Sequence, residues 1–466
     1  MPEGGWRGLF RRRSVDATLQ AGEESGFKRS LGATDLTGIG IAAIIGSGIF
    51  FLLGLEARST GPAVIVSLLL AGAAACLAAL SYAEFASILP GNGSAYEYAY
   101  AAFGRMPAFL MGWIFVNSYA IGNAVVVIGW SDFFASALAS VGMPLPDALL
   151  ASPGDGGIVN LPAILVTALV TLLVLQGIKE STRVNNALVA LKLLIVVFII
   201  GFGAFFVQPS NWTPFSPAGF SGVAASTAVL FFAYLGFDTV AAAGAEAREP
   251  RKHLPVAILV SIGVCTLLYV IMAAVVSGMT APADLAGRAP VAAAFGTEGH
   301  GWAAGVITLG ALIALATVTY AFHLAMARIF QAMGRDGFIP GAFAKMSPRT
   351  RTPAFSAIVV GLITAIAGGF LPLDKVVDMA VEASIAIYAL VSIGVLVLRR
   401  VQPAARPAFR TPAVIHVIAV VALVSVVAFG LGAFTHLAFL AWLGLGLAVY
   451  GFYASRRSHD IGGARS

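Results

Sequence analysis

Charged residues are scarce in this sequence. Only 11% of the 466 residues are Asp, Glu, Lys or Arg, whereas an ordinary soluble domain carries about a quarter. Hydrophobic residues make up 59%, which excludes a water-soluble protein of the usual kind. Apolar runs long enough to cross a hydrocarbon core recur along the chain, for example at residues 189–207 and 413–433. The composition therefore predicts a bundle of membrane-spanning helices.

Cysteine is also rare. Cys76 and Cys265 both lie in apolar runs, and neither has a partner at a spacing typical of metal or redox sites. We therefore expect no structural disulfide and no metal site. The first 30 residues contain no short apolar stretch followed by a small-residue cleavage site. We expect no cleaved signal peptide, so the first spanning helix should direct membrane insertion.

Catalytic motifs are missing as well. The sequence contains no His-Glu-x-x-His metal motif, no Gly-x-Ser-x-Gly nucleophile turn and no phosphate-binding Gly-x-x-x-x-Gly-Lys-Ser/Thr loop. These absences argue against an enzyme, predict no catalytic residues and no cofactor, and exclude ATP as a direct energy source.

Hydropathy and turn residues predict twelve spanning helices. We place them at residues 34–57, 61–90, 106–138, 161–180, 184–207, 221–246, 254–278, 302–334, 354–371, 374–399, 412–432 and 434–455. Residues 34–455 would then form one transmembrane domain, with short tails at residues 1–33 and 456–466.

The distribution of basic residues predicts the orientation. An even number of spans puts both termini on one side, and 24 of the 28 Lys and Arg residues fall on that side. Only Arg58, Arg288 and Lys375 fall on the other side, while Lys192 lies within a span. Because cytoplasmic loops collect Lys and Arg, both termini should be cytoplasmic in a bacterial inner membrane. The net charge of +6 then reflects a face against anionic lipid, and no nucleic-acid partner is needed.

Two spans carry glycines where a helix can unwind. Gly46-Ser47-Gly48 lies near the middle of the first span, and Gly236 interrupts the sixth at the corresponding position five helices later. Matching interruptions in two halves of a chain are typical of inverted-repeat transporters, whose substrate sites lie at the breaks. The alternative is that these glycines only let helices approach closely, since the chain has 52 of them.

Unwound backbone inside a membrane must line a cavity or meet a ligand, because its polar groups need partners. The half-helix after Gly48 would present N–H donors suited to a carboxylate. The half-helix that ends near Leu235 would present carbonyls suited to an ammonium group. Together the two breaks match the zwitterion of an α-amino acid.

Several short motifs carry a family resemblance. They are Gly46-Ser47-Gly48-Ile49-Phe50, Tyr82-Ala83-Glu84-Phe85, Gly93-Ser94-Ala95-Tyr96, residues 231–238 and Gly334-Arg335-Asp336-Gly337. Their order resembles that in the amino acid–polyamine–organocation superfamily, and most of all that in bacterial members of its cationic amino acid transporter family. The resemblance spans residues 31–410.

This resemblance implies an all-α fold like that of the leucine transporter, with two inverted five-helix repeats, two C-terminal helices and transport by alternating access. The implied carboxylate site is Ser47 and Gly48, and the implied ammonium site consists of the carbonyls of Ile44, Phe232, Ala233 and Leu235. Lys192 falls where related proton-coupled transporters carry a lysine in place of a sodium site. The implied coupling ion is therefore a proton.

Several positions depart from the family pattern, and two of them bear on the substrate. Ser118 stands before Tyr119 in the third span, where relatives can carry an acid, so a partner for a cationic side chain is missing. Phe322 in the eighth span would restrict the size of the substrate side chain. We expect small neutral amino acids to be favoured, with an amino acid or amine exchanger and a nutrient-sensing receptor as alternatives. Any accessory subunit stays open.

Four acids and a histidine in or near the predicted spans are further candidates for a functional or structural role. Glu84 and Glu246 lie near helix ends, where pairing with nearby Arg or Lys is expected. Asp238 and Glu382 lie deeper, and buried ionisable groups in membranes often mark function. His323 should point about 100° away from Phe322 on the same helix, as a packed side chain.

Overall fold

The computed structural model describes residues 10–15, 29–91, 94–177, 182–282, 285, 288–350 and 352–454. The predicted tail at 456–466, most of the predicted tail at 1–33, the motif residue Gly93 and the basic residue Lys179 lie outside these residues.

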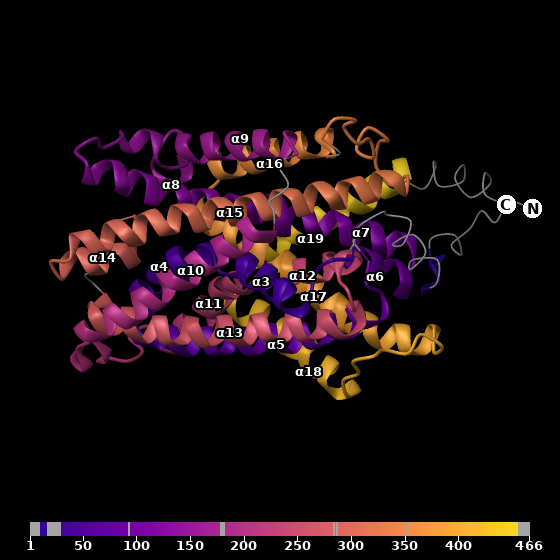
Figure 1. Cartoon of the computed structure of the whole chain (residues 1–466), viewed down its shortest axis with the longest axis horizontal. Helices are drawn as coiled ribbons and strands as arrows, with labels where there is room; N and C mark the ends of the chain where they lie inside the picture. Colours follow the sequence, from indigo (N-terminus) through magenta and orange to yellow (C-terminus); the bar gives the residue numbers. More distant parts are fainter. Residues whose placement is uncertain are drawn as a thin grey trace, which may run out of the picture.

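Long helices run side by side along the long axis of the molecule (Figure 1). The helices that cover the predicted spans are α3 (Ala33–Ile44) with α4 (Leu53–Thr60), α5 (Val64–Ile88), α7 (Arg105–Phe115) with α8 (Gly122–Ser140), α9 (Leu161–Leu175), α10 (Thr182–Gly203), α11 (Gly219–Phe231) with α12 (Thr239–Ala242), α13 (Pro250–Met279), α15 (Gly301–Arg335), α16 (Ala354–Phe370), α17 (Leu373–Val401), α18 (Ala413–Gly430) and α19 (Ala433–Val449). Within the described residues, nine helical stretches are long and apolar enough to cross a membrane. The predicted all-helical fold is confirmed for this part of the chain, and the nine apolar stretches agree with the predicted membrane class.

Two short helices lie outside the predicted spans. They are α6 (Ala95–Ala102), which packs against α7 and α17, and α14 (Pro290–Thr297), which packs against α15. Each has only eight residues, too few to cross a membrane, so a search for long apolar runs does not find them.

One end of the bundle gathers segments that are far apart in sequence. Arg13 pairs with Asp336 at 2.8 Å, and the backbone N–H of Val15 donates to the side chain of Gln402. This end, on the right in Figure 1, holds α6 and the connections from α15 to α16 and from α17 to α18. Three segments that the charge pattern assigns to one side of the membrane therefore lie together.

Arg288 lies at the opposite end, before α14. Its guanidinium contacts Asp132 at 3.0 Å, Asp147 at 3.1 Å and the carbonyl of Leu150 at 3.1 Å. Burial disfavours this charge, but the hydrogen bonds to the two carboxylates outweigh burial and raise the pKa of Arg288. The connection at residues 142–160 thus shares an end with Arg288, away from Arg13.

Candidate functional site

The first span is broken where the glycine motif predicts. Helix α3 ends at Ile44, and Ile45 is extended, with φ −73° and ψ 99°. A π-helical turn, η1 (Gly48–Leu52), then leads into α4. The sequence predicts that the second half-helix follows Gly48, whereas in the structure it begins at Gly48 itself.

The sixth span is broken over a longer stretch. Helix α11 ends at Phe231 and a short 3₁₀ turn, η8 (Phe232–Tyr234), follows it. Leu235 is extended, and Gly236 has φ +108°, a conformation that favours glycine because it has no Cβ. A Cβ at Gly236 would lie 2.9 Å from the carbonyl oxygen of Ala43, so the second break touches the end of α3.

The two breaks are in direct contact. The Cα of Gly48 packs so closely on Ala233 that any side chain at Gly48 would overlap the Ala233 backbone. On another side, a Cβ at Gly46 would lie 2.9 Å from Val318 of α15. The structure therefore brings the predicted residues Gly48 and Ala233 together, beside the eighth predicted span.

Three of the predicted ammonium carbonyls accept hydrogen bonds within the protein. The hydroxyl of Tyr269 on α13 donates to the carbonyl of Ile44 at 2.8 Å and to that of Ala233 at 3.3 Å. The carbonyl of Phe232 accepts the N–H of Leu235 inside the 3₁₀ turn. One donor thus bridges carbonyls from both breaks. Sequence reasoning missed Tyr269, although its hydroxyl in an apolar run needs a partner.

Ser118 lies in a turn of the third predicted span, and Phe322 packs against the same turn from α15. A π-helical turn, η3 (Val116–Ile121), separates α7 from α8. The hydroxyl of Ser118 lies 2.7 Å from that of Ser384 on α17, and the ring of Phe322 lies 5.2 Å from that of Tyr119. Both predicted residues are buried.

Asp238 forms the polar centre next to this turn. The hydroxyl of Tyr119 donates to one carboxylate oxygen of Asp238 at 2.6 Å, and that of Tyr388 on α17 donates to the other at 3.4 Å. The side chain is buried, so these two donors replace water. Asp238 therefore joins the second break to η3 and α17, which the sequence does not reveal.

Lys192 on α10 reaches the first broken helix. Its Nζ donates to the carbonyl of Ala42 at 2.8 Å, and the residue is only 1% exposed. Ala42 lies in the last turn of α3, where carbonyls lack partners within the helix. The next residue, Ala43, touches Gly236, so the lysine holds α3 at the point where the two breaks meet.

Three other predicted ionisable residues, Glu84, Glu382 and His323, link helices. Glu84 forms two hydrogen bonds with Arg399, at 2.8 and 2.7 Å, which confirms the predicted pairing at a helix end. Glu382 on α17 lies 3.0 Å from His436 on α19. His323 contacts a backbone carbonyl of α16 at 2.9 Å, as expected of a packed histidine.

The bundle contains two broken helices that meet beside the buried Lys192. This is the architecture of a membrane transport protein. The family model of amino acid permeases matches residues 31–449, which is most of the chain. The chain therefore belongs to the amino acid permease family of the amino acid–polyamine–organocation superfamily, and it is a transporter rather than an enzyme.

Individual relatives are similar over nearly the whole length. The branched-chain amino acid permease BcaP of Bacillus subtilis is 40% identical over 97% of this chain and 98% of its own. The methylthioribose transporter of the same organism is 39% identical over the same shares. The vacuolar cationic amino acid transporter 4 of Arabidopsis thaliana is 36% identical over 85% of this chain and 68% of its own.

Proposed function

We propose that this chain is a proton-coupled symporter of small neutral amino acids that works by alternating access. It would lie in a bacterial inner membrane with both termini cytoplasmic. In this proposal the twelve predicted spans form two inverted five-helix repeats, followed by α18 and α19. The matching breaks support the repeats, because they fall in the first span of each proposed half.

The contact between the two breaks carries the proposal. At Gly48 the half-helix η1–α4 begins, and the N–H groups of a first helical turn have no partner within the helix. The carbonyl of Ile44, four residues earlier, and that of Ala233, which Gly48 contacts, converge on the hydroxyl of Tyr269. Donors for a carboxylate and acceptors for an ammonium therefore occur side by side, as an α-amino acid requires.

The side-chain specificity is proposed from Ser118 and Phe322. Ser118 offers a hydroxyl and no charge, and the Phe322 ring occupies space beside Tyr119. The similarity to a branched-chain amino acid permease supports a neutral, apolar side chain. The similarity to a methylthioribose transporter is almost as high, but that thiosugar has neither a carboxylate nor an ammonium group for the two breaks.

Proton coupling is proposed to depend on Lys192. Placing a charged lysine at bilayer depth costs roughly 2.5–3.5 kcal/mol on insertion scales. Because this cost applies to the charged form, it favours release of the proton from Lys192. The protonated ammonium holds α3 through the Ala42 carbonyl, and deprotonation would free this helix to move. One proton would thereby shift the balance between two conformations.

Uptake by the purified protein in proteoliposomes tests this function. Labelled alanine or valine should accumulate when the outside is made acidic, and excess unlabelled amino acid should compete while methylthioribose should not. Uptake that needs amino acid inside the vesicles and ignores the pH gradient would instead identify an exchanger. Binding without flux under either condition would identify a receptor.

A further inference from the structure

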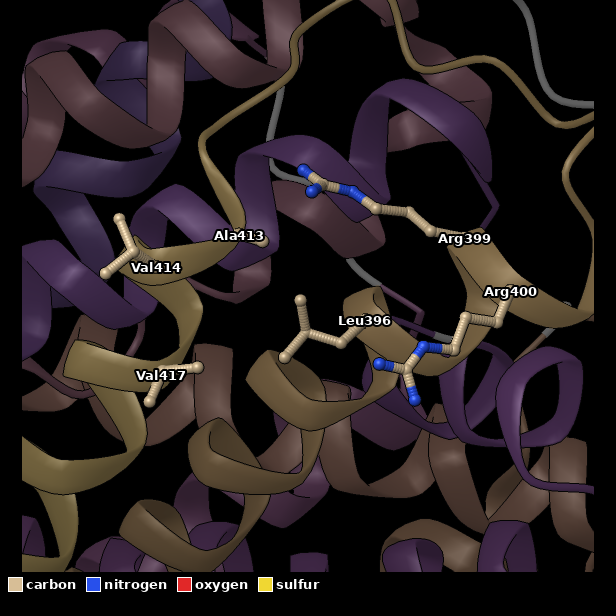
Figure 2. A pocket seen from close by; sticks show the side chains of 6 residues that line it. All are labelled: Leu396, Arg399, Arg400, Ala413, Val414 and Val417. Carbon is tan, nitrogen blue, oxygen red and sulfur yellow. The ribbon is translucent and has the colours of Figure 1, made fainter.

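A groove lies on the surface between the end of α17 and the start of α18 (Figure 2). Its volume is about 510 Å³. It is lined by Leu396, Arg399, Arg400, Ala413, Val414 and Val417. None of these residues belongs to the predicted substrate or coupling site, so the transport site does not account for the groove.

The walls of the groove are apolar and open outward. Val414 and Val417 are 59% and 52% exposed, although valine is usually buried. Further along α18, exposed Val421 and Val424 continue this apolar surface. In a membrane protein such a surface faces lipid chains, so the occupant of the groove must have an apolar part.

The two arginines at the rim are in different electrostatic states. Arg399 is compensated, because its guanidinium binds both carboxylate oxygens of Glu84. Arg400 is exposed, and no described residue forms an ion pair or hydrogen bond with it. Figure 2 shows its guanidinium turned back along α17 beside Leu396. Arg400 therefore places one uncompensated positive charge at the rim of an apolar groove.

The adjoining sequence adds charge of the same sign. Residues 402–412 connect α17 to α18 and include Arg406 and Arg410 but no Asp or Glu. A negative group that enters the groove thus meets no acid on this connection, and the rim complements an anion.

We propose that this groove binds one anionic phospholipid, with its phosphate on Arg400 and an acyl chain along Val414 and Val417. Leu396 precedes Arg400 by one helical turn, about 6 Å along the axis. A lipid whose phosphate binds Arg400 can therefore place the start of its acyl chain beside Leu396. A guanidinium binds phosphate oxygens in pairs. A free phosphate would leave the apolar walls uncovered, so a lipid fits both halves of the groove.

Native mass spectrometry of the full-length protein, titrated with phosphatidylglycerol or phosphatidylcholine, tests the headgroup contact. Arg400→Gln should raise the Kd for phosphatidylglycerol about fivefold, the factor that corresponds to about 1 kcal/mol per basic residue near an anionic surface. Binding of phosphatidylcholine should not change. Arg349→Gln is the matched control, because Arg349 is an exposed arginine on the connection from α15 to α16. An equal rise in the Kd for phosphatidylglycerol in both variants would overturn the proposal, because general surface charge would then explain the binding.

A second pair of variants tests the acyl contact while keeping every charge. Val417→Trp should fill the groove and displace phosphatidylglycerol, whereas Ile418→Trp should not, because Ile418 is similarly exposed but lies outside the groove. Wild-type affinity of Val417→Trp for phosphatidylglycerol would show that the groove is not the lipid-binding site. Displacement of the lipid by soluble glycerol phosphate would assign the site to free phosphate and also overturn the proposal.

Discussion

Gly48 of the first broken span lies directly against Ala233 of the second. Neither residue bears a side chain larger than methyl, and their backbones meet where the predicted carboxylate and ammonium sites adjoin. Any atom added at Gly48 must push the two breaks apart. The distance between the two halves of the proposed zwitterion site is therefore set by a glycine.

Gly48→Ala should reduce amino acid uptake at least tenfold, because the added methyl collides with the Ala233 backbone and overpacking costs about 1–3 kcal/mol. Gly201→Ala on α10 is the control, since a Cβ there would meet nothing within 4 Å. Initial uptake rates in proteoliposomes measure both. Normal uptake by Gly48→Ala would mean that close contact of the breaks is not required.

Phe322→Ser should admit bulkier neutral amino acids, because it removes an aromatic ring next to Tyr119. Truncating a buried Phe typically costs about 3–5 kcal/mol of stability, so uptake is compared at equal amounts of folded protein. Competition by a series of amino acids measures the change. A profile that matches wild type would remove Phe322 from the pocket.

Adding Ser118→Glu to Phe322→Ser should favour Arg or Lys through charge pairing. Ser384→Ala is the matched control, because it removes the hydroxyl partner of Ser118 without adding charge. If the double variant and the control show the same competition by Arg and Lys, the third-span position does not face the substrate side chain.

Arg288→Gln should destabilise the protein by about 1–3 kcal/mol, because it leaves the carboxylate of Asp132 without its charged partner. Asp147→Asn should change stability by less than about 0.5 kcal/mol, since the Asp147 side chain is 93% exposed against 13% for Asp132. Thermal unfolding in detergent compares the two. Equal shifts in Tm would contradict a dominant Asp132 contact.

The orientation predicts that a cysteine at Ile158, an exposed residue of the 142–160 connection, reacts with an impermeant thiol reagent from outside the cell. Cys76 must first be replaced by Ala because it is exposed. A cysteine at Met346, at the other end of the bundle, should react only after permeabilisation. The reverse pattern would invert the topology.

Long-range contacts mark the limit of what this sequence can predict. Hydropathy locates the twelve helical stretches, and local glycines locate both breaks, because each signal lies within a single span. The bonds from Tyr269 to Ile44 and from Tyr119 to Asp238 join residues 225 and 119 positions apart, and no local pattern encodes them. The position of Lys192 within a span and the family resemblance both single out this residue, but only the structure shows its contact with Ala42.

Gradient-driven uptake by Lys192 variants tests proton coupling most directly. Lys192→Met should bind substrate but fail to concentrate it under an imposed pH gradient, because no proton on this residue then controls α3. Lys192→Arg should fail as well, since arginine does not deprotonate in proteins. Concentration of substrate by Lys192→Met to the wild-type level would contradict the account and turn attention to Asp238 and Glu382. Concentration by Lys192→Arg alone would make Lys192 a permanent structural cation.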